Sequence, residues 1–199
     1  MFCHTPHATG TISCALHSAL IPLPAEITNS EIMRYTEKYP EFASLYNYEA
    51  EEIRIEEVCI RNISFESDGI SGNLFSGRDR EIRENLNFTY PVFMPPDRES
   101  KKVILLLHGL NERSWNKYLV WAYQLSVATG SYVVLFPISF HINRSPVSWK
   151  DPRSMIRFLN DRILTRGKVR SSCFANIALS NRLSDDPRRF LKSGYQTVS

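Results

Sequence analysis

Long apolar runs and glycine are both scarce in this sequence of 199 residues. No apolar run approaches the about 18 residues that a membrane-spanning helix needs, so we expect no membrane span. The 8 glycines are too few for a collagen-like or linker-rich chain. With 43% hydrophobic and 23% charged residues, the composition instead predicts one packed domain of ordinary size, or part of a larger one.

Cysteine pairs and cofactor-binding motifs are also missing. The four cysteines include no C-x-x-C pair, which favours reduced thiols over a disulfide framework. Zinc-binding residue types do form one run, Cys3, His7, Cys14 and His17. The spacing of this run matches no common zinc finger, and it lies at a chain terminus, so we expect no metal. The sequence contains neither G-x-G-x-x-G nor a P-loop, so we expect no cofactor.

Negative charge is scarce in the second half of the chain. Residues 1–100 hold 8 Lys and Arg against 16 Asp and Glu, whereas residues 101–199 hold 16 against 5. Because the basic residues are not interleaved with aromatics in a stacking pattern, we expect a solvated surface or attraction between the two halves, and no nucleic-acid partner. The N-terminus lacks the basic start of a signal peptide, and we expect a cytoplasmic protein.

Three segments of the chain differ in their sequence pattern. Residues 1–50 look irregular apart from one short helix, which begins at the capping-box pattern T-N-S-E of residues 28–31 and ends at Pro40. Residues 51–139 are predicted to form strands and one central helix. Residues 140–199 are predicted to be helical. Two Asp-Pro pairs are typical of helix starts, and Phe190 and Leu191 are predicted to begin the apolar face of the helix after the second pair.

The first strands of the middle segment carry alternating apolar residues. Residues 51–66 alternate with a change of phase between Ile55 and Val58, which suggests a bulge or bend. Residues 85–94 form another strand, and Pro91 places it near a sheet edge or ends its first part. The pattern is typical of antiparallel, half-exposed strands.

A parallel βαβ unit is predicted after these strands. Val103–Leu107 and Tyr132–Phe136 are continuous apolar runs, which are typical of strands in the middle of a parallel sheet. Residues 115–129 have helical periodicity, and Gly130 suits the position after the helix. Two buried parallel strands make a poor sheet by themselves, so we expect an incomplete domain, the N-terminal part of a longer protein.

The chemically informative stretch follows the first parallel strand and reads V-I-L-L-L-H-G-L-N-E-R-S-W. Gly109 permits close backbone approach and unusual dihedral angles. Backbone N–H groups just after it are expected at the carboxyl edge of the sheet, where ligands of open α/β sheets bind. Donors fixed at such a place can stabilise a developing oxyanion.

At these residues the sequence resembles the α/β-hydrolase family. The resemblance covers about residues 51–139 and implies an α/β fold, in which antiparallel strands lead into a parallel βαβ unit followed by a helical cap or insertion over residues 140–199. It implies that His108 and Gly109 form the oxyanion turn, with His108 structural, and that the backbone N–H of Leu110 is one oxyanion donor. Asn111 is the alternate donor.

A narrower resemblance extends further along the chain. The strings H-G-L-N-E-R-S-W, F-P-I-S-F-H-I-N-R-S-P and P-R-R-F-L-K-S-G-Y-Q are similar to a bacterial α/β-hydrolase-like family of unknown function. Three residues after the second parallel strand, His141, Asn143 and Arg144, are weaker candidates for substrate binding. The competing interpretation, slightly preferred, is a loop whose side chains pin its own turn.

The nucleophile of the family is absent from this sequence. No G-x-S-x-G occurs, and the family order of Ser, then Asp or Glu, then His places all three after Ser199. The resemblance therefore implies the N-terminal fragment of a serine hydrolase of esters, thioesters or amides, with a small acyl substrate and half of an oxyanion hole. Asp or Cys nucleophiles fit equally well. The chain alone is predicted to be inactive, with the missing C-terminal half of the same fold as its partner. The alternative is a non-catalytic binding or scaffold domain of the same fold.

Overall fold

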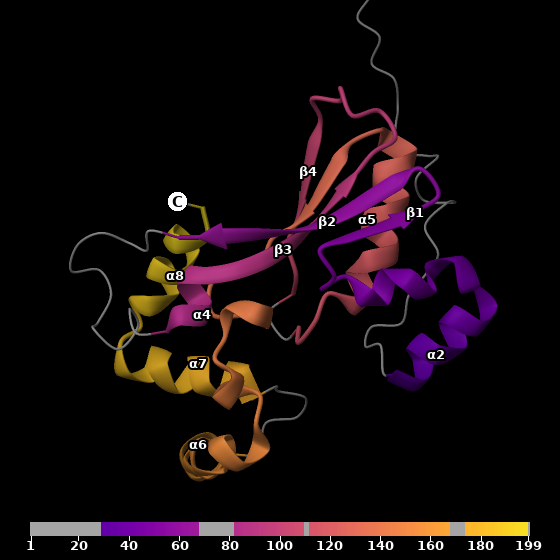
Figure 1. The fold of residues 1–199 in the computed structure, drawn as a ribbon. Helices are drawn as coiled ribbons and strands as arrows, with labels where there is room; N and C mark the ends of the chain where they lie inside the picture. Colours follow the sequence, from indigo (N-terminus) through magenta and orange to yellow (C-terminus); the bar gives the residue numbers. More distant parts are fainter. Residues whose placement is uncertain (1–28, 68–81, 110–111, 168–173, 199) are drawn as a thin grey trace, which may run out of the picture.

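The computed structural model describes residues 29–67, 82–109, 112–167 and 174–198. They form a mixed α/β fold around one five-stranded sheet with the strand order β1-β2-β3-β5-β4 (Figure 1). The elements are α2 (Asn29–Lys38), η1 (Pro40–Asn47), β1 (Glu52–Ile55), β2 (Val58–Glu66), α4 (Arg83–Leu86), β3 (Asn87–Met94), β4 (Val103–Leu106), α5 (Asn116–Thr129), β5 (Tyr132–Leu135), η2 (Ile142–Arg144), η3 (Val147–Trp149), α6 (Pro152–Arg166), α7 (Phe174–Asp185) and α8 (Arg189–Val198).

The predicted βαβ unit is confirmed. Strands β4 and β5 are parallel neighbours, with Val103 opposite Tyr132 and Leu106 opposite Leu135. Helix α5 connects them and ends at Gly130, which adopts the left-handed conformation with φ 59°. The carboxyl ends of both parallel strands therefore meet at one edge of the sheet.

The predicted bulge or bend within residues 51–66 is a full reversal of the chain, so the prediction of a bulge is wrong. Glu56 and Glu57 form a two-residue turn between β1 and β2, and Ile55 lies opposite Val58 in an antiparallel hairpin. Residues that lie opposite each other share one face of the sheet, which explains the change of phase. Glu56 has φ 50°, the left-handed conformation that hairpin turns require.

The antiparallel pairing of the first strands is confirmed, and the position of Pro91 is explained by it. Strand β3 pairs with β2 along its whole length, but with β5 only at Val92 and Phe93. Pro91, which has no N–H to donate, lies where β3 has a partner on one side alone. Although β3 is an inner strand, it therefore has an edge-like stretch at this residue.

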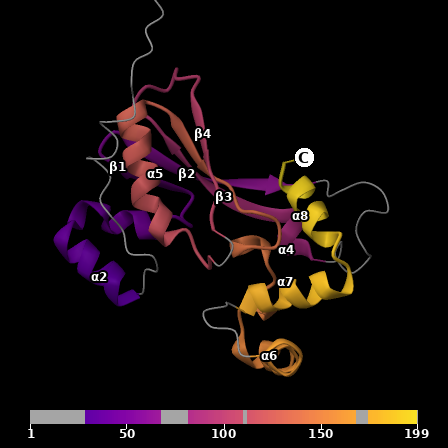
Figure 2. The same ribbon diagram turned by 180° about the vertical axis from the view of Figure 1, so that it is seen from behind.

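The core lies between α5 and one face of the sheet. Phe93, Val133 and Leu135 of the sheet are fully buried there against Leu119 and Ala122 of α5. Figure 1 shows the sheet in front of α5, and Figure 2 shows α5 crossing the opposite face. None of the described helices crosses the face that is turned towards the viewer in Figure 1.

Strand β4 lies at the edge of the sheet among the described residues, and not in the middle as its apolar sequence predicts. Its inner residues Ile104 and Leu106 contact the core, whereas Val103 is 65% exposed and Leu105 is 56% exposed. The apolar run is therefore explained on one face only, because these two side chains of the outer face remain largely exposed.

The C-terminal helices begin close to the predicted positions. Asp151 caps α6, and its carboxylate accepts hydrogen bonds from the backbone N–H groups of Arg153 and Ser154. Helix α8 exposes its predicted apolar face to solvent: Phe190 is 67% exposed and Leu191 is 74% exposed. The side of α8 that contacts the protein is polar, because its partners are the backbone of residue 139 and the side chain of residue 85, both polar groups that need hydrogen bonds.

Candidate functional site

The His108-Gly109 turn lies at the carboxyl end of β4 and is bonded to the end of β5. The Nδ1 atom of His108 lies 2.8 Å from the carbonyl oxygen of Gly109, and the backbone N–H of Ile138 donates to Nε2 at 3.0 Å. Because Nε2 accepts a hydrogen bond, the ring proton is on Nδ1. The histidine ring therefore links the loops that follow the two parallel strands.

Burial keeps this histidine neutral. It lowers the pKa of His108 to about 4, and electrostatic repulsion from His141 and Lys117 acts in the same direction. The hydrogen bond to the Gly109 carbonyl opposes this shift. At neutral pH the ring is uncharged and both of its nitrogens are bonded to the protein.

Gly109 is held closely by its neighbours. Its N–H donates to the hydroxyl of Tyr118 at 2.8 Å, and a Cβ atom at this position would lie 3.3 Å from Oε1 of Glu112. The Glu112 carboxylate also pairs with Lys117. The two oxyanion-donor candidates of the sequence, Leu110 and Asn111, lie outside the described residues.

A buried arginine fixes the loop that follows β5. Arg144 donates to the side chain and backbone oxygens of Asn85 and to the backbone oxygen of Pro137, at 3.1–3.2 Å. Its guanidinium lies 4.2 Å from the centre of the Phe88 ring. Burial lowers the pKa of Arg144 to about 10, so the group remains charged at neutral pH.

Asn85 extends this network to the last helix. Its side-chain oxygen accepts the backbone N–H of Phe140, and its amide nitrogen donates to Gln196 of α8 at 2.9 Å. The network thus joins α4, the loop after β5 and α8, which are far apart in the sequence. The hydrogen bonds of Arg144 thus hold its own loop in place, as in the interpretation that the side chains of this loop pin its turn.

A cleft lies beside the His108-Gly109 turn, and residues of the loops that follow β4 and β5 line it. One hollow of about 300 Å³ is bordered by β2, β3, the residues before β1 and the loops after β4 and β5. Its lining residues are Tyr48, Glu49, Asn62, Thr89, Pro91, Arg113, Trp115, Ile142, Asn143 and Lys150. A second hollow of about 250 Å³ is lined by Glu112, Arg113, Ile142, Ser145, Trp149, Lys150, Pro152, Phe174 and Ala175. The two hollows adjoin, because Arg113, Ile142 and Lys150 line both, and together they are called the cleft.

The turn and the cleft are connected through Trp115. The Trp115 ring packs edge-on against His108, with ring centres 5.3 Å apart, and Trp115 also lines the first hollow. Of the three weaker sequence candidates, Asn143 lines the cleft, whereas His141 lies behind the turn with its ring 5.3 Å from that of His108. The structure therefore brings His108, His141 and Asn143 to one region and places Arg144 in the loop network.

Trp115 and Asn143, which line the first hollow, each have one buried polar atom with no hydrogen-bond partner among the described residues. These atoms are Nε1 of Trp115, a donor, and Oδ1 of Asn143, an acceptor. The Asn143 amide nitrogen already donates to the backbone oxygen of Thr89 at 2.7 Å, which fixes the orientation of the side chain. Burial and the charge of Glu49 raise the pKa of Tyr48 to about 12, so its phenol is neutral. Unpartnered buried polar atoms in a cleft are typical of a site that is completed by a ligand or water.

The loop that forms the cleft wall has a strained backbone. Phe140 has φ 65° and Ile142 has φ 48°, the left-handed region that non-glycine residues rarely adopt. For a β-branched residue such as Ile142 this conformation costs about 1–3 kcal/mol and persists only when its surroundings enforce it. Ile142 lines both hollows, so the strain lies at the centre of the cleft.

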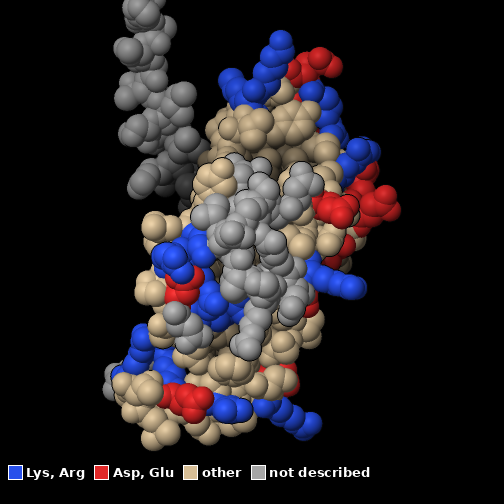
Figure 3. Space-filling view, turned by 90° about the vertical axis from the view of Figure 1, so that its left-hand side faces the viewer, with Lys and Arg blue, Asp and Glu red and all other residues tan. Residues whose placement is uncertain are grey.

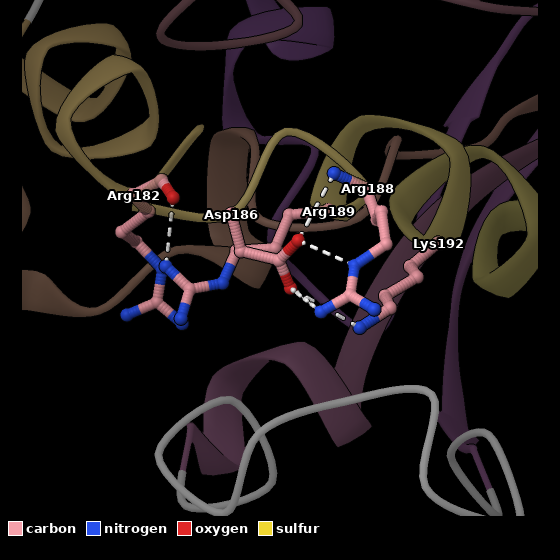
Figure 4. Close-up of polar contacts among 5 residues, drawn as sticks. All are labelled: Arg182, Asp186, Arg188, Arg189 and Lys192. Atoms are coloured by element: carbon pink, nitrogen blue, oxygen red, sulfur yellow. Dashed lines mark hydrogen bonds and ion pairs between the residues drawn. The ribbon is translucent and has the colours of Figure 1, made fainter. Parts of the chain in front are cut away.

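Basic residues of the C-terminal helices form a second cluster, which is largely satisfied by its own acid. Asp186 pairs with Arg188 and Lys192, and Arg189 donates to the backbone oxygen of Arg182 at 2.8 Å (Figure 4). These contacts lower the pKa of Asp186 to about 2, chiefly through the hydrogen bond from Arg188. In Figure 3, basic side chains on this side of the molecule lie next to acidic ones. The cluster therefore fixes the corner between α7 and α8.

The described residues contain no group of three or more His, Cys, Asp or Glu side chains placed to hold a metal ion. The run from Cys3 to His17 lies outside them. In the same part of the chain, none of the helices is both long enough and apolar enough to cross a lipid bilayer.

Several cleft residues were not candidates in the sequence. Arg113 and Trp115 stand directly after the turn in the H-G-L-N-E-R-S-W string, so their closeness to His108 was the available signal. Lys150 precedes the capping Asp151 and has no local signal of its own. Glu49 and Asn62 come to the cleft through the hairpin pairing, which no local pattern specifies.

The fold and the cleft define a mixed α/β protein with a candidate ligand site at the carboxyl ends of its parallel strands. Residues 73–199 match a family of unknown function, DUF6051, and the chain belongs to this family. The match includes the turn, the loop after β5 and the three C-terminal helices. No curated protein and no solved structure matches the chain.

Proposed function

We propose that this chain supplies the substrate cleft and one oxyanion-stabilising turn of a hydrolase of the α/β-hydrolase type, which acts on an ester, thioester or amide. The observation that carries the proposal is the position of the His108-Gly109 turn at the carboxyl end of a parallel strand. The His108 ring contacts Trp115, and Trp115 lines the cleft. Ligands of open α/β sheets bind at this edge. In the family that the sequence resembles, the corresponding turn donates an N–H group to the oxyanion.

The hydrogen bonds of the turn support this role. The Gly109 N–H is already bonded to Tyr118, so the proposed donor is the following residue, Leu110, with Asn111 as the alternate. The bridge from His108 to Ile138 fixes the base of the turn. A donor that is fixed before charge develops stabilises an oxyanion without reorganisation at the moment of reaction.

The nucleophile, acid and base are proposed to come from residues that follow Ser199, in the order Ser, Asp or Glu, His. An Asp or Cys nucleophile would serve the same turn. The rest of the same fold is the proposed packing partner. The apolar side chains Val103, Leu105 and Leu107 support it, because they are exposed on the outer face and edge of β4, where further strands and helices of such a fold pack.

The test is hydrolysis of activated esters by the full-length protein, together with labelling by a fluorophosphonate probe. We expect a labelled serine beyond residue 199 and none within residues 1–199. Leu110→Pro removes the proposed N–H and is expected to lower kcat by about 100-fold to 1,000-fold with little change in KM. Leu110→Ala retains the N–H and is the matched control.

Two results would contradict the proposal. The first is a folded full-length protein that neither hydrolyses any activated ester nor reacts with the probe. The second is a Leu110→Pro variant that is folded and as active as Leu110→Ala, which would remove the oxyanion role from this turn.

A non-catalytic binding domain is the second candidate function. The unpartnered Trp115 Nε1 and Asn143 Oδ1 favour it, because a bound polar ligand would satisfy them without any chemical step. Saturable binding of a small molecule in the cleft without turnover would distinguish this function from a hydrolase.

A further inference from the structure

We propose that the cleft binds an amphipathic organic anion, with its carboxylate or phosphate between Arg113 and Lys150 and its apolar body in the second hollow. This ligand class rests on the proposed function, which takes the same cleft as the binding site. Three separate features of the lining residues carry it.

The first feature is positive charge at the junction of the two hollows. Arg113 and Lys150 line both hollows. Within the described part of the chain, neither side chain makes an ion pair or hydrogen bond. The carboxylate of Glu112 is paired with Lys117, and Glu49 lines the first hollow only. The junction therefore holds two cations that no described residue compensates by an ion pair or hydrogen bond, which favours an anionic ligand.

The second feature is the apolar wall beyond this junction. Ile142, Trp149, Pro152, Phe174 and Ala175 line the second hollow. Trp149 is held in place on its other side by the ring of Phe140 and the guanidinium of Arg182. A small inorganic anion would leave this wall in contact with water, whereas an aryl or short acyl chain would cover it.

The third feature is a pair of polar atoms in two residues that line the first hollow. Trp115 Nε1 can donate one hydrogen bond and Asn143 Oδ1 can accept one, and both atoms are buried. A ligand that reaches from the junction into this hollow satisfies them with a carbonyl oxygen and an N–H or O–H group. The strained backbone of Ile142 places its side chain between the two hollows, where it separates the polar from the apolar part of such a ligand.

The experiment is a titration of the full-length protein, followed by isothermal calorimetry and by tryptophan fluorescence. The probes are 4-phenylbutyrate, phenethyl phosphate and the neutral 4-phenylbutyramide, which has the shape of the first probe without its charge. We expect at least one anion to bind about tenfold or more tightly than the amide. The better of the two anions identifies the ligand as a carboxylate or a phosphate.

Arg113→Gln and Lys150→Gln are each expected to weaken binding of the preferred anion by about tenfold and to leave amide binding unchanged. Lys101→Gln, an exposed lysine before β4, is the matched control and should bind like the unmodified protein. Equal affinity for anions and amide, unchanged anion binding in both cleft variants, or no saturable binding would overturn the inference.

These outcomes are separate from those of the proposed function. Anion binding without any hydrolysis would support the inference and contradict the hydrolase. Hydrolysis of neutral esters with no preference for anionic ones would support the hydrolase and contradict the inference.

Discussion

At the scale of single residues, His108 acts as a fixed link between two loops. Its Nδ1 donates to the Gly109 carbonyl oxygen and its Nε2 accepts the N–H of Ile138. A second proton on the ring would remove the bond from Ile138 and bury a positive charge next to His141. The shape of the turn therefore depends on the neutral ring.

This dependence predicts how stability responds to acid. The pKa of His108 is lowered in the folded state to about 4, whereas an unperturbed histidine titrates near 6.5, so the unfolded chain binds a proton first. The contribution of His108 to the free energy of unfolding is therefore complete above pH 6.5 and falls as the pH falls towards 4. Since one pKa unit corresponds to about 1.4 kcal/mol, we expect a loss of about 3 kcal/mol.

Urea denaturation at a series of pH values measures this loss. His108→Asn is the control, because it removes the titrating ring while leaving a side chain that can donate and accept hydrogen bonds. The variant is expected to be less stable at pH 7 but to lose less stability between pH 6.5 and 4. Parallel pH profiles for the two proteins would contradict the role of His108.

Sequence reasoning reached the site only at the residues that directly follow the two parallel strands, the turn after β4 and Asn143 after β5. His108 and Gly109 were found because a strand, a glycine and a helix follow one another in the chain. Arg113 stood in the same string, but a charged residue in a loop is usually solvated, so its type alone carried no signal. Glu49 comes from more than 50 residues away through the hairpin, and only tertiary structure reveals its position.

At the scale of the elements, two helices contain or adjoin a glycine, and only one of these glycines is required by the backbone conformation. Gly130 ends α5 in the left-handed conformation, with φ 59°. Gly194 lies within α8, and nothing lies within 4 Å of a Cβ atom added to it. The two glycines thus form a matched pair with opposite expected responses to alanine.

Gly130→Ala is expected to lower the free energy of unfolding by about 1–2 kcal/mol, because alanine pays the steric cost of the left-handed conformation. Gly194→Ala is expected to raise it by about 0.5–1 kcal/mol, because glycine inside a helix has the higher entropy loss on folding. Thermal and urea unfolding of both variants provide the measurement. A Gly194→Ala variant that is destabilised as much as Gly130→Ala would mean that α8 packs more closely than described.

The elements that were predicted correctly are those with strong local signals. The cap at Asp151, the end of α5 at Gly130 and the apolar runs of β4 and β5 depend on neighbouring residues only. The hairpin at Glu56 was missed because it lacks the Asn-Gly or Asp-Gly sequence that usually marks a two-residue turn. The orientation of α8 was missed because its partners are polar groups of distant segments.

At the scale of the whole molecule, the sheet is covered by a helix on one face. The aromatic side chains Phe65, Tyr90 and Phe136 cluster together on the other face, with ring centres 5.2–6.4 Å apart. Exposed Val103 and Leu105 lie on β4 at the sheet edge. An apolar sheet face and an unpaired strand edge favour association with other protein surfaces.

In a protein of residues 1–199 alone, Leu105→Lys is therefore expected to reduce concentration-dependent association and to change the free energy of unfolding by less than about 0.5 kcal/mol. Leu106→Lys, one residue along β4, faces the core and is the contrasting variant, with an expected loss of several kcal/mol, about the cost of burying an unpaired charge. Light scattering over a range of concentrations and urea unfolding provide the two measurements. Equal destabilisation by both substitutions would show that the outer face is covered.

The α/β class and the neighbouring parallel strands followed from the sequence because apolar runs specify which strands are buried. The strand order did not follow from it. A run that is apolar on both faces predicts two covered faces, but it does not state which segment covers each one. For β4, the segment that would cover the outer face is not among the described residues.

The network of Asn85, Arg144 and Gln196 has a consequence for the order of folding. The bond between Asn85 and Gln196 joins residues 111 positions apart, whereas the pairs of the β1-β2 hairpin and the crossover from β4 to β5 are much closer in sequence. Contacts of large sequence separation require the costliest loop closure and form late. During synthesis, the five described strands can therefore pair before α8 leaves the ribosome, and the loop that Asn85 and Arg144 hold gains its contact with α8 only afterwards.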